Sequence, residues 1–279
     1  MEDGLEELQQ RLVEMLLAFQ EFTQENGVTF FLVGGSALGA VRHQGFIPWD
    51  DDVDVAMMRE DFEKMEHLMK MQGNRLGQFV YSPVEKHIIP DAPIGYLYDL
   101  LHADAGYENT AKIDIHPIDG VPKSRLLRKV QKWTSLIYYL SEYRLPVKNK
   151  GTVVRNISKV ILKITPDCMF RFYMKICKKI MTSWSTFDSE YICSLFGVAG
   201  YEREVMPKKY LFPLQKAMFE MEVFLIPGSQ DAYLKRLYGD YHKNGGSKWQ
   251  SYRNHYEQND ASVFTGRTGC DECGRKRSL

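Results

Sequence analysis

Apolar and polar positions along the chain predict alternating helices and strands in its first half. Apolar residues recur every three or four positions over residues 2–26, which predicts an amphipathic helix that ends at Gly27. An apolar run at residues 28–33 and an alternating pattern at residues 53–57 predict two strands with buried faces. Residues 59–73 return to helical spacing, with acidic side chains first and a glycine last.

The same reasoning extends the sheet and then interrupts it. Three more strands are predicted at residues 78–82, 94–100 and 112–116. Residues 123–195 have a helical pattern, with breaks expected at Pro146, Gly151 and Pro166. A strand at residues 218–227 is then followed by a helix that starts from Ser229. The expected fold class is α/β (α+β), with a mixed sheet flanked by helices.

These elements suggest one domain with an insert. A core at residues 1–122 is followed by a helical insert at 123–195. A strand and a helix at residues 196–264 return to the core, and residues 265–279 form a flexible tail without apolar periodicity. The length of 279 residues is enough to bury a sizeable core.

Charge is distributed unevenly although the chain is neutral overall. Residues 123–181 contain 15 Lys and Arg but only Glu142 and Asp167 as acids, a net +13 that the rest balances with 21 basic and 34 acidic residues. Aromatic residues stand near these cations, and the combination suits an anionic membrane surface. Two alternatives remain. In the first, the basic residues form solvated helix faces that cover an acidic half of the protein. In the second, they attract an anionic polymer, although nucleic acid is not expected.

Composition also bears on location. No run approaches the roughly 18 apolar residues that would span a bilayer, and the N-terminus is acidic rather than signal-like. The five cysteines are scattered and odd in number, which favours reduced thiols over a disulfide framework. A cytoplasmic protein is expected, peripheral at the inner face of the membrane if the basic insert binds lipid.

A glycine turn follows the first predicted strand. Gly34 and Gly35 let the backbone turn sharply and approach a ligand, and the next helix presents N–H groups to an anion. Ser36 is placed either to cap that helix or to donate its hydroxyl to a phosphate. Two glycines before a helix also occur in plain turns, so this signal needs support from elsewhere.

Four aspartates supply that support. Asp52 and Asp54 are two positions apart on a predicted strand, so both side chains point to the face opposite the valines between and after them. Neighbouring carboxylates repel each other unless a cation lies between them, and Mg²⁺ prefers such oxygen ligands. Asp50 and Asp51 directly precede this pair. The alternative is a solvated acidic turn, which would not interleave carboxylates with core valines.

A third acidic strand makes the site more specific. Asp114 lies between Ile113 and Ile115, so it too opposes core residues. Three aspartates on two strands beside a glycine turn could hold two Mg²⁺ ions, or Mn²⁺ instead, and a diphosphate. Asp114 is then a general base or a metal ligand. His116, two residues on, shares that task or is a hydrogen-bonding partner.

The string "GGSALGAVRHQGFIPWDDDVDVAM" at residues 34–57 resembles the LicD family, which includes the fukutin-type transferases of the nucleotidyltransferase-like superfamily. "KIDIHPIDG" and "DAYLKRLYGDYHK" are similar to later motifs of that family. The resemblance covers residues 28–60, 110–121 and 229–243 and leaves the helical middle unmatched. The gap of 15 residues between Ser36 and Asp52 is slightly longer than is usual in the superfamily.

The resemblance implies transfer of a phospho-alcohol from a CDP-activated donor to a sugar of a cell-surface glycan, with release of CMP. Phosphocholine is the first expectation; ribitol or glycerol phosphate are related cargoes. Carried onto this chain, it implies that Asp52, Asp54 and Asp114 bind metal, supported by Asp50 and Asp51. It also implies that the diphosphate is held by Gly34, Gly35, Ser36 and Arg42. No family role carries over to His116.

Aromatic residues are candidates for binding the transferred group, because a quaternary ammonium prefers aromatic faces or acidic neighbours. The candidates are Trp49, Tyr96, Tyr98, Tyr238, Asp240 and Tyr241. Ordinary core packing is the alternative for each aromatic. Two rival functions also remain: a nucleotidyltransferase that releases pyrophosphate, and a glycan-binding scaffold that has lost catalysis.

Overall fold

A computed structural model of the chain describes residues 2–82, 94–99, 111–143 and 152–242. The chain divides into two compact units, Met1–Leu237 and Tyr238–Leu279. Among the described residues, the strands and helices belong to the first unit, apart from the last residue of the final helix. The boundaries predicted for the insert and the core stay predictions, and the predicted tail lies outside the described residues.

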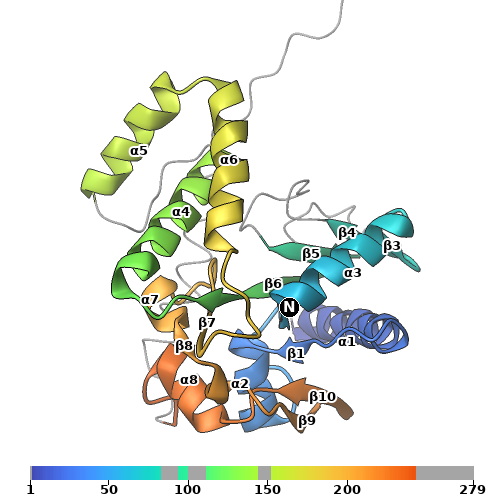
Figure 1. Cartoon of the computed structure of the whole chain (residues 1–279). Helices are drawn as coiled ribbons and strands as arrows, with labels where there is room; N and C mark the ends of the chain where they lie inside the picture. Colours follow the sequence, from blue (N-terminus) through green and yellow to red (C-terminus); the bar gives the residue numbers. More distant parts are fainter. Residues whose placement is uncertain (1, 83–93, 100–110, 144–151, 243–279) are drawn as a thin grey trace, which may run out of the picture. The chain divides into compact units, whose positions relative to one another are not determined.

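The main sheet of the first unit is mixed, as predicted (Figure 1). Within the described residues its strands follow the order β1-β2-β6-β5-β4-β3, and β7 lies between β6 and β8. Strands β2 and β6 run parallel, whereas the other pairs are antiparallel. The strands are β1 Phe31–Leu32, β2 Val53–Met58, β3 Arg75–Leu76, β4 Phe79–Ser82, β5 Gly95–Tyr98, β6 Lys112–Val121, β7 Tyr191–Ser194 and β8 Met206–Pro207.

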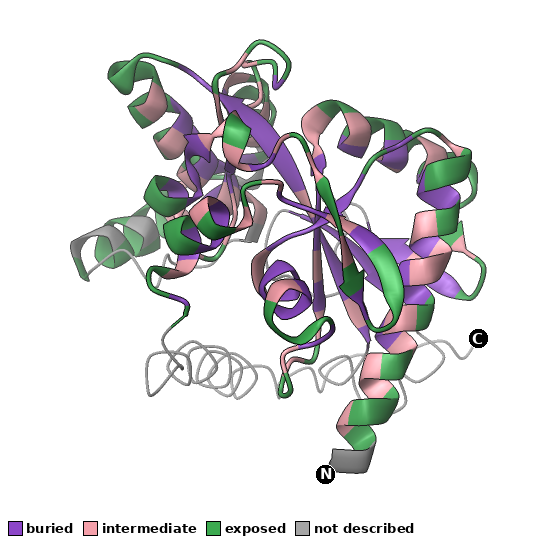
Figure 2. Cartoon of the chain, turned by 90° about the horizontal axis from the view of Figure 1, so that it is seen from below, coloured by how far each residue is buried: buried purple, intermediate pink, exposed green. Residues whose placement is uncertain are grey.

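Helices cover this sheet and form the insert. They are α1 Glu2–Glu25, α2 Gly34–His43, α3 Arg59–Met71, α4 Arg125–Tyr143, α5 Thr152–Ile164, α6 Asp167–Met181, α7 Tyr201–Glu204 and α8 Gln230–Tyr238, with a 3₁₀ turn at Lys208–Tyr210. Apolar residues of α1 and α3 join β2 and β6 in one core. Figure 2 shows burial concentrated along the central strands, with exposed residues on the outer helices.

Two sequence expectations about strands were wrong. Residues 191–194 were expected to be helical, but they form β7, because β6 continues past His116 to Val121 and offers a free edge that β7 pairs with. The single strand expected at residues 218–227 is a hairpin instead. Its strands β9 (Gln215–Phe219) and β10 (Glu222–Ile226) meet at a tight turn.

A buried ion pair joins α3 to the middle of the sheet. Arg59, the first residue of α3, donates from Nε and Nη2 to the two carboxylate oxygens of Asp119 on β6, at 2.7 Å each. The side chains are 11% and 1% exposed, respectively. Because α3 follows β2 directly, this fork fixes the C-terminal end of β2 against β6, at the end of the pairing away from Asp54 and Asp114.

Candidate active site

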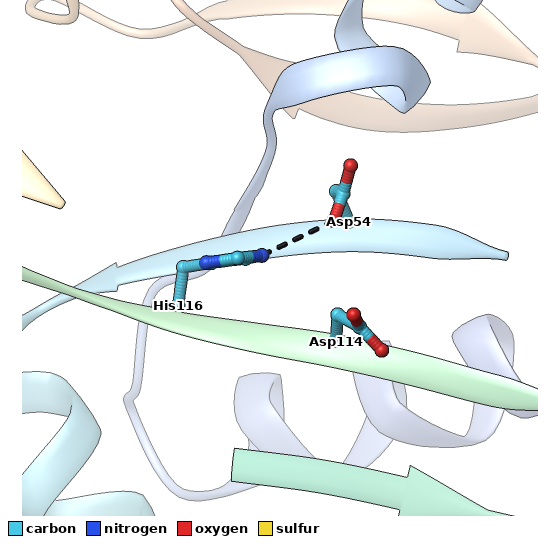
Figure 3. A group of neighbouring side chains, drawn as sticks. All are labelled: Asp54, Asp114 and His116. Atoms are coloured by element: carbon cyan, nitrogen blue, oxygen red, sulfur yellow. Dashed lines mark hydrogen bonds and ion pairs between the residues drawn. The ribbon is translucent and has the colours of Figure 1, made fainter. Parts of the chain in front are cut away.

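Asp54 and Asp114 face each other across two parallel strands. The register of β2 and β6 pairs Asp54 with Asp114, so their side chains lie on the same face of the sheet (Figure 3). The residues on either side of them, Val53, Val55, Ile113 and Ile115, are fully buried on the opposite face. Carboxylate oxygens of both aspartates and a ring nitrogen of His116 lie within 4.8 Å of one another.

His116 holds the carboxylate of Asp54. Its Nε2 lies 3.1 Å from Asp54 Oδ1. Burial alone would lower the pKa of His116, but the hydrogen bond and the charge of Asp54 outweigh it and raise the pKa. Burial would likewise raise the pKa of Asp54, but the hydrogen bond from His116 and its charge lower it. The histidine is therefore the donor of this bond and the aspartate is ionised.

Lys112 is a site residue that the sequence reasoning missed. Its Nζ lies 3.1 and 3.2 Å from the two oxygens of Asp114 and 3.7 Å from Asp52 Oδ2. It therefore places a positive charge between two carboxylates. The signal was available, since Lys112, Asp114 and His116 alternate along one strand and must share a face.

The remaining aspartates form a second acidic group just before β2. Carboxylate oxygens of Asp50, Asp51 and Asp52 lie within 4.8 Å of one another. Burial, followed by the charges of Asp54 and Asp51, raises the pKa of Asp50 to about 7. Burial also raises the pKa of Asp52 well above its usual range, although Lys112 opposes it. Asp52 was predicted to share a metal with the other two strand aspartates, and this stays a prediction. Its carboxylate lies near those of Asp50 and Asp51, and Lys112 lies between it and Asp114.

The donor atoms of both groups fit a divalent cation. Each group gathers at least two carboxylates, which are the hard oxygen ligands that Mg²⁺ and Mn²⁺ take in proteins. Burial raises the pKa of Asp50 and Asp52, and the neighbouring carboxylates add to the rise. A divalent cation held by these groups would favour their ionised forms.

The glycine turn packs directly against both acidic groups. Gly34 has φ +53°, and a Cβ added to it would lie 2.6 Å from Asp54 Oδ2. A Cβ on Gly35 would lie 3.1 Å from Asp50 Oδ2. Glycine is thus required at the first position for conformation and for space. The backbone N–H of Gly34 donates to the hydroxyl of Tyr233 at 3.0 Å.

Ser36 has a structural role at the start of β2. Its Oγ accepts the backbone N–H of Asp54 at 2.9 Å. Helix α2 begins at Gly34 with Val33 as the flanking residue and no side-chain cap, so Ser36 does not cap the helix. The serine lies inside the first turn of α2 and is 2% exposed.

Arg42 lies at the other end of the same helix. It is an exposed residue in the last turn of α2, eight residues from Gly34, which corresponds to about 12 Å along the helix axis. The described structure therefore does not bring Arg42 beside the glycine turn.

The predicted substrate residues have different surroundings. Trp49 is 52% exposed. Tyr96 is paired in register with Asp114, and Lys112 Nζ lies 5.8 Å from the centre of its ring. Tyr98 stacks on Tyr96 at 5.6 Å, and both are buried. The predicted residues Tyr238, Asp240 and Tyr241 belong to the second unit.

Glu204 is a buried carboxyl that the sequence reasoning also missed. Burial raises its pKa to about 7, although the charge of His116 and the backbone N–H of Ala199, 3.3 Å from Oε1, lower it. It follows the unmatched helical middle and lies in no motif, so only the fold identifies it.

Replacing Glu204 by Gln should remove a pH-dependent cost to stability. A carboxyl with a folded pKa of about 7 instead of 4.5 binds protons more tightly in the folded chain. The free energy of unfolding therefore falls as pH rises between these values, by about 3 kcal/mol for this group. Urea titrations at pH 4.5 and pH 8 measure this effect. From the lower to the higher pH, the free energy of unfolding of Glu204→Gln should rise by about that much relative to the unmodified chain. Glu222→Gln, at an exposed position on β10, should show no such gain; equal behaviour of the two variants would contradict the assignment.

Comparison with known proteins agrees with this geometry. Residues 27–118 match the family described as LicD/FKTN/FKRP, nucleotidyltransferase domain. The chain is 26% identical over 258 residues to the lipopolysaccharide cholinephosphotransferase LicD of Haemophilus influenzae, covering 86% of this chain and 91% of that protein.

Two other relatives match over shorter stretches. An uncharacterized protein of Rickettsia typhi is 32% identical over 110 residues, which is 35% of this chain and 36% of that protein. The human ribitol 5-phosphate transferase FKRP is 52% identical over 42 residues, 15% of this chain and 8% of that protein. The matched family segment spans the glycine turn, both acidic groups and His116. Residues 27–118 of the chain are therefore similar to the nucleotidyltransferase domain of the LicD/FKTN/FKRP family.

Proposed function

We propose that this protein transfers a phospho-alcohol, phosphocholine in the first instance, from a CDP-activated donor to a sugar hydroxyl of a cell-surface glycan and releases CMP. The observation that carries the proposal is the registered pair Asp54 and Asp114 beside the glycine turn. The similarity to a cholinephosphotransferase over most of the chain supports the cargo, and the match to a ribitol 5-phosphate transferase supports the wider class.

The reaction is a displacement at phosphorus. The acceptor hydroxyl oxygen attacks the phosphorus that carries the alcohol, the bond from that phosphorus to the CMP oxygen breaks, and CMP leaves with the electron pair. The hydroxyl proton needs an acceptor. Asp50, with a pKa of about 7, is able to take a proton near neutral pH and is our candidate, whereas Asp114 is already paired with Lys112.

Metal binding is assigned to the two acidic groups. We propose Asp54 and Asp114 for one ion, with Asp52 and Asp51 beside the second position. Mg²⁺ or Mn²⁺ held there would screen the negative charge of the diphosphate. His116 orients Asp54 through its hydrogen bond, and Lys112 adds a fixed positive charge to the same face.

The remaining predicted residues keep their proposed roles in binding the donor. The backbone of Gly34 and Gly35 and the Ser36 hydroxyl would contact the diphosphate, and Arg42 an outer part of the donor. Trp49 is the exposed aromatic closest in sequence to the acidic groups, which makes it our first candidate for the cargo's ammonium group.

A panel of CDP-choline, CDP-ethanolamine, CDP-glycerol and CDP-ribitol tests the proposal. With Mg²⁺ present, at least one donor should raise the melting temperature of the purified full chain, and incubation with a glycan acceptor should release CMP. Release of pyrophosphate from a nucleoside triphosphate instead would identify a nucleotidyltransferase. Binding of glycan with no turnover of any donor would identify a scaffold.

A further inference from the structure

Helix α5 carries an apolar face that nothing in the described structure covers. Its apolar residues Ile157, Val160, Ile161 and Ile164 recur at helical spacing, and they are between 36% and 71% exposed. In Figure 1 the helix lies at the outer end of the insert, away from the sheet, while α4 and α6 pack against each other. A helical stripe of four exposed branched residues is costly in water, which suggests a partner.

The opposite face of α5 is cationic. Arg155, Lys159 and Lys163 follow each other at intervals of four residues and lie roughly opposite the apolar stripe. All three are exposed. The helices on either side, α4 and α6, are also rich in Lys and Arg, and residues 123–181 as a whole carry a net charge of +13.

The neighbouring helices repeat the pattern of exposed apolar side chains. On α4 these are Leu126, Val130, Trp133 and Ile137, and on α6 they are Met169, Phe172 and Ile176. The other face of each of these two helices is buried, with Tyr138 and Cys177 in a shared core. The insert therefore has a core of its own, and its exposed apolar residues are separate from that core.

We infer that α5, supported by the exposed stripes of α4 and α6, binds in the plane of an anionic lipid bilayer. A helix with an apolar stripe, a Lys- and Arg-rich polar face and low overall hydrophobicity is suited to the boundary between head groups and acyl chains. Within the described residues, no helix has the length and apolar composition to cross a membrane. The inference goes beyond the proposed reaction and does not depend on it.

Charge favours lipid over a second copy of this chain as the occupant. Two copies related by a two-fold axis would bring the same strongly positive segments together, and like charges would repel at the contact. An anionic bilayer instead attracts each nearby Lys or Arg while it receives the apolar stripe.

Flotation with lipid vesicles tests the inference on the full chain. The protein should float with phosphatidylcholine vesicles that contain phosphatidylglycerol, and binding should weaken as salt is raised. Ile164→Asp should reduce the partition coefficient about tenfold, because the apolar side chain that would enter the bilayer is replaced by a charge. Lys159→Glu with Lys163→Glu should reduce it at least tenfold on anionic vesicles.

A matched control is available at the end of α3. Met71 is 73% exposed and is the last residue of its helix, as Ile164 is at 71% in α5. Met71→Asp should bind vesicles like the unmodified chain, and thermal melts should show that all variants fold. Equal binding by the two variants, binding that ignores salt or lipid charge, or absent binding would overturn the inference. A dimer dissociated by Ile164→Asp, without vesicle binding, would assign the face to self-association.

Discussion

Replacing Asp54 by Asn is expected to lower the turnover number about a thousandfold, which corresponds to about 4 kcal/mol of lost transition-state stabilisation. Asp54 lies in register with Asp114 and accepts the hydrogen bond of His116, so its carboxylate is the centre of the strand-borne group. The amide of Asn keeps the shape but cannot supply the negative charge that a divalent ion requires. Steady-state release of CMP from the best donor measures the change.

A second readout separates metal binding from other causes. Titration of Mn²⁺ by electron paramagnetic resonance should show weaker binding by Asp54→Asn, while Asp188→Asn, an exposed aspartate remote in sequence, should bind like the unmodified chain. Asp52→Asn should also reduce turnover if the second acidic group holds an ion. Unchanged Mn²⁺ affinity and turnover in Asp54→Asn would refute the assigned site.

The placement of the strand aspartates on one face could be predicted because it follows from strand alternation. Asp54 and Asp114 each stand between two fully buried apolar residues of their strand, so a carboxylate on the face opposite those residues could be inferred from the sequence. The pairing of their strands could not. Parallel pairing of β2 with β6 brings together residues 60 positions apart, and no local pattern encodes that register.

What the sequence reasoning missed depends on the same long-range contacts. The spacing of Lys112 predicts that it shares a face with Asp114. Its position between Asp52 and Asp114, however, depends on two strands and on the loop before β2. Tyr233, which accepts the N–H of Gly34, comes from a helix 199 residues away. The strand β7 was mistaken for helix because its four residues gain their conformation from the free edge of β6.

Replacing Arg59 by Met should destabilise the fold by about 3–5 kcal/mol at neutral pH, because it leaves a buried carboxylate without its partner. Asp119 is 1% exposed and accepts both hydrogen bonds of the Arg59 fork. Burial already raises the pKa of Asp119 against the opposing charge of Arg59, and loss of that charge would raise it further. Urea denaturation followed by circular dichroism measures the free energy of unfolding.

The pH dependence and a double variant identify the cause. A carboxyl whose folded pKa is raised loses stability as pH rises, so the deficit of Arg59→Met should shrink between pH 7 and pH 5 as Asp119 takes up a proton. Adding Asp119→Leu should restore most of the loss, since an apolar pair leaves no unpaired charge. Arg75→Met, on the exposed strand β3, should cost less than about 0.5 kcal/mol. A deficit that is independent of pH and remains in the double variant would mean that Arg59 acts through packing, and that the fork to Asp119 does not hold the C-terminal end of β2 against β6.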